Sequence, residues 1–178
     1  MESLLVVTVS TLLAVLLARV IRHRFGFVTE VESLSMAPTL APGQRLLARR
    51  PGAARPLRRG DIVVVDSAEI GRPIVKRVVG LPGEQLDVDA DGRVQVAGHE
   101  LVEPYVVHRG GRRGTFEVPP GHLLLLGDNR AGSSDARVWR APYVPVSAVL
   151  GRVVRLRSPA APGDADPRPS RSAAAPAG

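Results

Sequence analysis

The 178-residue sequence has no cysteine, and its aromatic residues are three Phe, two Tyr and one Trp. Without cysteine there is no disulfide framework, no thiolate zinc site and no cysteine nucleophile. Aromatic residues make up only 3% of the chain, which argues against stacking platforms for single-stranded nucleic acid. The four histidines are scattered, so the sequence predicts neither a metal site nor a cofactor. Val, Leu, Ala and Ile must supply the core.

Lysine is almost absent too. The formal net charge is +7, yet Lys76 is the single lysine among the 24 Lys and Arg residues. An arginine guanidinium keeps its proton in proteins, whereas a lysine amine can lose its proton once burial lowers its pKa. Two interpretations are open: chance in an arginine-rich composition, or a lysine retained because its proton has to leave.

An apolar segment opens the chain. Residues 3–18 carry no charge, and if Arg19 snorkels, the stretch 3–21 forms a helix of roughly 28 Å, which spans a bilayer. A cleaved signal peptide is the alternative, but its basic start and its small-x-small end are missing. We therefore expect an uncleaved transmembrane anchor over 3–21. Because Arg19, Arg22 and Arg24 follow this span, the positive-inside rule places the main domain in the cytoplasm.

Short runs of β-prone residues, each ended by turn residues, follow the anchor. They predict a mainly β domain over 25–157, an antiparallel sheet or a barrel-like structure. The clearest runs are 62–66, 74–80, 85–89, 93–98 and 122–128. Residues 110–114, Gly-Gly-Arg-Arg-Gly, predict a mobile loop. The Pro/Ala-rich segment 158–178 has no apolar pattern and predicts a disordered tail.

Six arginines without an intervening acid precede Asp61. They are Arg45, Arg49, Arg50, Arg55, Arg58 and Arg59. A solvated loop is the first interpretation, and a patch that meets anionic lipid head groups is the second. Binding to nucleic acid comes third.

Three blocks carry residues suited to catalysis. Residues 33–40, Ser-Leu-Ser-Met-Ala-Pro-Thr-Leu, would hold a serine hydroxyl at the end of a strand beside a proline turn. Lys76 lies in a β-prone run, where apolar neighbours can desolvate its amine. Residues 127–137 combine turn formers with charged side chains. Taken alone, each block is also compatible with an ordinary surface turn or strand.

Together and in this order, the blocks resemble those of the bacterial type I signal peptidases, membrane-anchored serine proteases of peptidase family S26 with a Ser-Lys dyad. The resemblance covers roughly residues 28–155, with matching segments at 35–40, 59–64, 76–84, 127–130 and 144–145. It implies the signal-peptidase-like antiparallel β domain with one N-terminal transmembrane helix. The stretch between the lysine block and residue 127 is short, so the extra β region of larger members is expected as a hairpin or two. Ala136 departs from the serine that is usual in the family.

The resemblance implies roles for four residues. Ser35 is the nucleophile, Lys76 the general base, Ser33 an oxyanion-hole hydroxyl, and Ser133 a hydroxyl that orients the lysine amine. A serine hydroxyl is a weak nucleophile until a base takes its proton. A lysine can be that base if apolar burial keeps its amine neutral and no carboxylate lies close to it.

The resemblance also implies two structural ion pairs near the site, Asp128 with Arg77 and Asp135 with Arg137. The alternative is that Asp135 acts as a third catalytic member. A carboxylate touching the amine of Lys76 would raise its pKa and oppose its deprotonation.

The family cleaves secretory preproteins after small residues on the outer face of the membrane. The resemblance therefore implies a single-pass membrane protein with an extracytoplasmic catalytic domain, with preproteins and the lipid bilayer as partners and no nucleic acid. This orientation conflicts with the arginines after the anchor. Pocket walls are expected from Leu34, Met36, Ile74 and Val75, with an apolar approach at Phe25, Phe27 and Val28. The oligomeric state stays open.

Two other functions stay open. One is a dedicated maturation protease of the same dyad class, acting on one secreted or partner protein. The other is a membrane-tethered binding module without catalysis, which would use its arginines on anionic lipid.

Overall fold

The computed structural model of the chain describes residues 7–16, 26–52 and 56–154. Of the expected anchor 3–21, residues 7–16 form a helix, and the rest lies outside the described residues. In the described ranges, no helix is both long and apolar enough to cross a membrane. The expected tail at 158–178 and Phe25 also lie outside the described residues.

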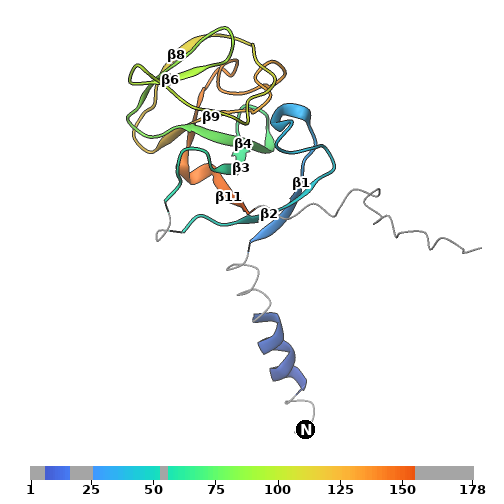
Figure 1. Cartoon of the computed structure of the whole chain (residues 1–178). Helices are drawn as coiled ribbons and strands as arrows, with labels where there is room; N and C mark the ends of the chain where they lie inside the picture. Colours follow the sequence, from blue (N-terminus) through green and yellow to red (C-terminus); the bar gives the residue numbers. More distant parts are fainter. Residues whose placement is uncertain (1–6, 17–25, 53–55, 155–178) are drawn as a thin grey trace, which may run out of the picture.

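The described chain between residues 27 and 154 is mainly β, as predicted (Figure 1). Its strands are β1 (Phe27–Glu30), β2 (Arg45–Arg49), β3 (Ile62–Ser67), β4 (Arg72–Gly80), β5 (Gln85–Val88), β6 (Val94–Val96), β7 (His99–Glu100), β8 (Gly114–Glu117), β9 (His122–Leu126), β10 (Tyr143–Pro145) and β11 (Val149–Val154). Two short 3-10 helices accompany them, η1 (Leu34–Met36) and η2 (Val146–Ala148).

The strands form two antiparallel sheets. A seven-stranded sheet has the order β1-β2-β11-β3-β4-β9-β10, and a four-stranded sheet has the order β7-β6-β5-β8. Figure 1 shows β6 and β8 of the small sheet beyond β4 and β9, on the side away from β1 and β2. The small sheet comprises residues 85–117, between the lysine block and the block at residue 127.

Branched aliphatic residues explain the central strands. Val63, Val64 and Val65 of β3 are all buried, and so is the run Leu123–Leu126 of β9. Consecutive buried residues mean that both faces of these strands are covered, which is why they are continuous apolar runs instead of alternating ones. The main core packs these strands against β5 and Phe116, so the two sheets share it.

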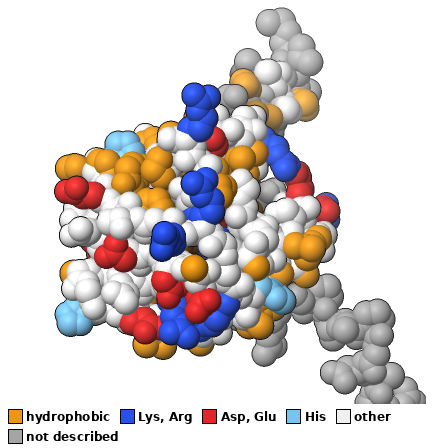
Figure 2. Space-filling model, turned by 90° about the horizontal axis from the view of Figure 1, so that it is seen from above, with side chains coloured by type: hydrophobic (Ala, Val, Ile, Leu, Met, Phe, Trp, Pro, Cys, Tyr) orange, Lys and Arg blue, Asp and Glu red, His pale blue; other side chains and the backbone are white. Residues whose placement is uncertain are grey.

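The six arginines do not form one solvated loop, and that first interpretation is wrong for Arg45, Arg49 and Arg59, while Arg55 lies outside the described residues. Arg45 and Arg49 are the exposed ends of β2, while Leu46 and Ala48 between them are fully buried. Arg59 forms an ion pair with Glu84 at 2.5 Å. Figure 2 shows basic and acidic side chains interspersed on the face that it displays, without one continuous basic surface.

The segment 110–114 is more firmly held than a mobile loop. The amide of Gly110 donates a hydrogen bond to the Asp91 carbonyl at 2.9 Å, and its carbonyl accepts one from Arg137 at 3.0 Å. Gly114 already belongs to β8. The Gly-rich composition suggested freedom, but long-range partners that the local pattern does not reveal fix this backbone.

Candidate active site

The η1 turn presents Ser35. Ser33 caps the turn, and its hydroxyl lies 3.1 Å from Ser35 Oγ and 3.5 Å from the Ser35 amide. The following residues Met36 and Leu40 are buried in a small core with Val31 and Leu46. This apolar anchoring holds the serine in place, and Ser35 itself is buried.

Lys76 comes from the middle of β4, where it pairs with Val63 of β3. Its amine donates a hydrogen bond of 2.7 Å to Ser35 Oγ. Only 4% of Lys76 is exposed. This burial lowers the pKa of Lys76 from 10.5 to about 8, against the attraction of Asp135 and Asp128 and with a smaller lowering from Arg137. The amine therefore reaches its neutral form near the pH at which a general base is useful.

Both carboxylates near the lysine are paired with arginines. Asp128 accepts two bonds from the Arg77 guanidinium, at 2.8 and 2.5 Å, and Asp135 accepts two from the Arg137 guanidinium, at 2.8 and 2.9 Å. Asp135 also accepts the amide of Gly127 at 3.0 Å. Among the described residues, neither carboxylate accepts a hydrogen bond from Lys76. Asp135 thus acts on the lysine through its charge and holds the turn after β9.

Ser133 lies near the backbone of Ser35 and forms no hydrogen bond with Lys76 among the described residues. Its hydroxyl oxygen is buried and has no hydrogen-bond partner among the described residues. A Cβ built on Gly127 would stand 2.1 Å from Ser133 Oγ and 2.5 Å from the Ser35 carbonyl oxygen, so these three residues meet. The amide of Asn129 further ties this block to η1 by a 3.1 Å bond to the same carbonyl.

A groove of about 250 Å³ leads away from the dyad. Its walls are the segment 29–33 and the β4 segment 72–76, together with Ser35, Met36 and Val64. Met36, Ile74 and Val75 therefore line it as predicted. Leu34 does not, and that prediction is wrong: its side chain lies 62% exposed because the 3-10 turn directs Ser35 and Met36 inward instead.

An ion pair between Glu32 and Arg72 joins the two walls of this groove. Both side chains are more than half exposed. Glu30 lines the groove as well, so two acids and one arginine border it.

Sequence reasoning missed a buried polar network behind the site. Arg130 is fully buried and pairs with Glu103 at 2.7 Å. Glu103 also accepts the Tyr105 hydroxyl at 2.6 Å, and burial together with this bond raises the pKa of Tyr105. The guanidinium of Arg77 lies 3.8 Å from the centre of the Tyr105 ring, a cation–π contact. The sequence holds no signal for the contacts of Arg130 with Glu103 and of Arg77 with Tyr105, because the partners are distant along the chain.

The comparisons with known proteins agree with this arrangement. The sequence profile of the family described as signal peptidase, peptidase S26, matches residues 4–156. The chain belongs to this family. It is 37% identical over 169 residues to signal peptidase I of Leptolyngbya laminosa, covering 89% of this chain and 82% of that protein. It is 36% identical over 137 residues to signal peptidase I T of Bacillus subtilis, covering 70% of each.

A solved structure extends the agreement to the fold. A signal peptidase I from Enterococcus faecalis superimposes with a TM-score of 0.50 at 27% identity, covering 56% of this chain and 98% of that one. The predicted resemblance is thus confirmed, as is the mainly antiparallel β fold. Membership of peptidase S26 makes the protein a serine endopeptidase.

Proposed function

We propose that this S26 endopeptidase cleaves signal peptides from secretory preproteins after small residues, with Ser35 as nucleophile and Lys76 as general base. The observation that carries the proposal is the 2.7 Å contact between Lys76 Nζ and Ser35 Oγ in a site that buries both residues. A hydroxyl next to a desolvated amine is the arrangement that nucleophilic catalysis needs when no histidine takes part.

The reaction proceeds in two steps. The neutral amine of Lys76 takes the Ser35 proton while Ser35 Oγ attacks the scissile carbonyl carbon, and the resulting ammonium protonates the leaving amine as the C–N bond breaks. Water then attacks the acyl-enzyme while Lys76 accepts its proton, and as the ester bond to Ser35 Oγ breaks, the lysine ammonium returns the proton to Ser35 and the carboxylic acid product leaves. The oxyanion of each intermediate is held by the Ser35 amide and the Ser33 hydroxyl, which lies 3.1 Å from Ser35 Oγ. Losing one such donor costs about 3 kcal/mol in the barrier.

Ser133 completes the proposed site as the hydroxyl that orients the lysine. Its buried oxygen, unpartnered among the described residues, is available to accept a hydrogen bond from an amine that shifts during proton transfer. The ion pairs of Asp128 with Arg77 and of Asp135 with Arg137 hold the surrounding backbone and take no part in the chemistry.

An extended substrate lies between the segments 29–33 and 72–76. A shallow groove between two chain segments suits a peptide bound through its backbone, and apolar walls at Ile74 and Val75 favour small side chains near the cut. The stretch 3–21 is the proposed transmembrane anchor, 25–157 the extracytoplasmic catalytic domain, and 158–178 a disordered tail. Protease treatment of intact cells tests this orientation, and a fully shielded domain would contradict it.

The test of the chemistry is cleavage of a peptide with an Ala-x-Ala site, in detergent, across pH 6 to 10. The full-length protein, Ser35→Ala and Lys76→Arg are compared. We expect cleavage by the unmodified protein only, with kcat/KM rising through a pH of about 8 as Lys76 loses its proton. Equal cleavage by all three proteins would exclude the Ser-Lys mechanism.

A dedicated maturation protease of the same dyad class is the second candidate. The charged border of the groove, formed by Glu30, Glu32 and Arg72, favours it, because such a border selects among substrates. Expression in cells depleted of their general signal peptidase discriminates the two, since only a general enzyme restores growth.

A further inference from the structure

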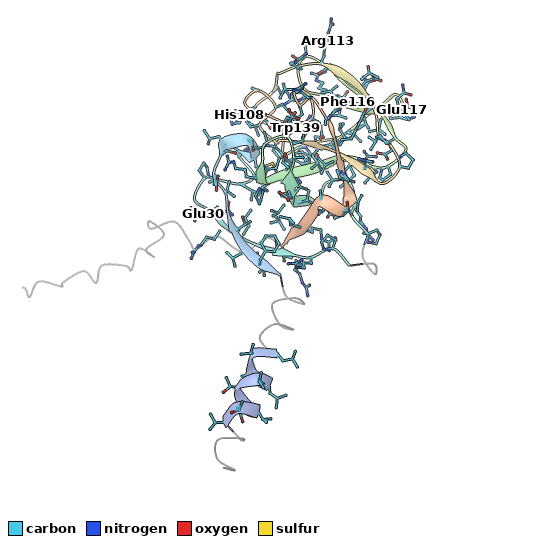
Figure 3. All side chains as sticks on the ribbon, turned by 180° about the vertical axis from the view of Figure 1, so that it is seen from behind. Glu30, His108, Arg113, Phe116, Glu117 and Trp139 are labelled. Carbon is cyan, nitrogen blue, oxygen red and sulfur yellow. The ribbon has the colours of Figure 1, made fainter. Side chains whose placement is uncertain are left out.

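A loop of the small sheet packs directly against the ion pair that neighbours the dyad. Residues 108–111 lie between β7 and β8, and Figure 3 marks His108 near the start of the loop and Arg113 close to β8. The carbonyl of His108 accepts the Ala131 amide at 3.2 Å, and the Gly110 carbonyl accepts Arg137 Nη1 at 3.0 Å. The loop therefore touches the block 127–137 at two points.

Arg137 is held from three directions. Besides Gly110, its guanidinium donates to the Arg130 carbonyl at 2.7 Å and to both oxygens of Asp135. The side chain is nearly fully buried, so its position is set by these partners and not by solvent. Any atom added beside the guanidinium must displace it.

Gly111 is the residue that leaves this space. A Cβ on Gly111 would lie 2.4 Å from Arg137 Nη1 and 2.7 Å from the Arg130 carbonyl oxygen. Its neighbour Gly110 has nearly the same backbone conformation, with φ +116 against +110, but a Cβ there would meet only the Ala131 Cβ at 3.8 Å. Both glycines thus adopt a positive φ, but only a side chain at position 111 would collide with Arg137.

The position of Arg137 affects the protonation of Lys76 through its positive charge. The charged groups that act on the buried amine are Asp135 and Asp128, which favour its protonated form, and Arg137, which opposes it. Asp128 is balanced by Arg77 at 2.5 Å and Asp135 by Arg137 at 2.8 Å. If Arg137 moves away, the charge of Asp135 acts on the lysine without its counterion.

We propose that Gly111 is a positioning residue for the general base: the space that it leaves lets the loop of the small sheet hold Arg137 against Asp135, and this keeps the charges around Lys76 balanced. The proposal rests on Lys76 acting as the base. It gives the small sheet an indirect influence on Lys76, although none of its residues, all of which are described, forms a hydrogen bond with Ser35 or Lys76.

The test compares Gly111→Ala with Gly110→Ala in the full-length protein. Both variants force alanine into a positive φ, so the backbone strain is matched, and only the Cβ at position 111 strikes the Arg137 guanidinium directly. The readout is kcat/KM against pH from about 6 to 10 on the Ala-x-Ala peptide, together with the thermal midpoint. We expect the acid limb of the kcat/KM profile of Gly111→Ala to move up by at least about half a pH unit, and that of Gly110→Ala, whose carbonyl also binds Arg137, to move by clearly less.

The same substitution made in an Arg137→Lys protein shows whether the shift of the acid limb depends on Arg137. Arg137→Lys keeps the positive charge but lacks the Nη1 atom that a Cβ at 111 would strike. In this background Gly111→Ala should move the acid limb by less than in the unmodified protein. An equal shift in both backgrounds, or equal profiles for the two glycine variants, overturns the proposal.

If Gly111→Ala does not fold, the pair Gly111→Asn and Gly110→Asn replaces it. Asparagine tolerates positive φ better than alanine and still carries the Cβ that matters. Full activity of Lys76→Arg would instead refute the Ser-Lys mechanism, and failure of the unmodified protein to cleave the peptide would refute the proposed general processing of preproteins. The two failures are thus distinguishable.

Discussion

Gly127 lies so close to Ser133 that a Cβ at position 127 would stand 2.1 Å from the Ser133 hydroxyl oxygen. The same Cβ would lie 2.5 Å from the carbonyl oxygen of Ser35. Real Cβ atoms do not approach so closely, so glycine alone allows the chain after β9 to touch both the backbone of Ser35, the proposed nucleophile, and the hydroxyl of Ser133.

We therefore expect Gly127→Ala to lower kcat by about a hundredfold, because a displacement near 1 Å in the reacting groups has that effect. Gly132→Ala is the control: its nearest atoms belong to the Asn129 side chain, at 3.1 Å or more, which can turn aside. Single-turnover cleavage of the Ala-x-Ala peptide measures the chemical step. An unchanged kcat in Gly127→Ala would show that the turn adjusts to the added Cβ without displacing the reacting groups.

The depressed pKa of Lys76 also predicts a pH-dependent stability. In the unfolded chain the amine titrates near 10.5, and in the folded protein near 8. Between these values the unfolded state binds a proton that the folded state lacks, so the free energy of unfolding rises as pH increases from about 8 to about 10.5. Below pH 8 the folded protein carries the full penalty, on the order of 3 kcal/mol.

Lys76→Met removes this titration. We expect the variant to be more stable than the unmodified protein at pH 7, with the difference shrinking as pH approaches 10. Urea unfolding at several pH values measures it. Parallel stability curves for the two proteins would mean that Lys76 titrates alike in both states.

Asp128 and Arg77 form a buried pair, with side chains 1% and 9% exposed. Asp128→Asn should lower the free energy of unfolding by about 3 kcal/mol or more, because it leaves a buried guanidinium without its counterion. The exposed pair of Arg72 with Glu32 is the matched control, and Arg72→Ala should cost less than about 1 kcal/mol. Equal losses in both variants, measured in urea, would contradict this ranking.

The groove border predicts a substrate preference. Arg72 is four residues from Lys76 along β4, so an extended peptide reaches it about four residues from the cut, roughly 13 Å away. Because Glu30 and Glu32 outnumber Arg72 there, we expect a peptide with Lys at that position to be cleaved about two- to fivefold faster than one with Glu at low salt.

Arg72→Ala should widen this difference, and Glu32→Gln should narrow it. The preference should also fade as ionic strength rises, since exposed charges are screened. Initial rates on the paired peptides at two salt concentrations measure both effects. Equal rates for the Lys and Glu peptides in every variant would show that the charged border of the groove does not select substrates.

The sequence predicted the strands that are continuous apolar runs. The runs 62–66 and 122–128 became β3 and β9, because consecutive Val or Leu residues can only be covered on both faces. It missed β2, whose inward residues Leu46 and Ala48 stand between arginines. The five residues of β2 begin and end with arginine, so their alternating pattern is too short to predict a strand within a cluster of charged residues.

For the site, the sequence predicted which blocks matter but not how they are supported. Ser35 and Lys76 could be named because their blocks follow one another in a recognisable order. The pairing of Arg130 with Glu103 could not, since the two residues are 27 positions apart and neither has a local partner pattern. The same holds for Gly111, whose importance depends on the side chain of Arg137 in another segment.

The position of β11 in the large sheet has a consequence for synthesis. In the order β1-β2-β11-β3-β4, strand pairing joins the β1-β2 hairpin, which contains Ser35, to the β3-β4 hairpin, which carries Lys76, through β11 (Val149–Val154). A nascent chain that has emerged as far as residue 140 holds both dyad residues but lacks the strand between their halves. We therefore expect peptide-cleaving activity to begin only after residues 149–154 have been synthesised and have joined the large sheet.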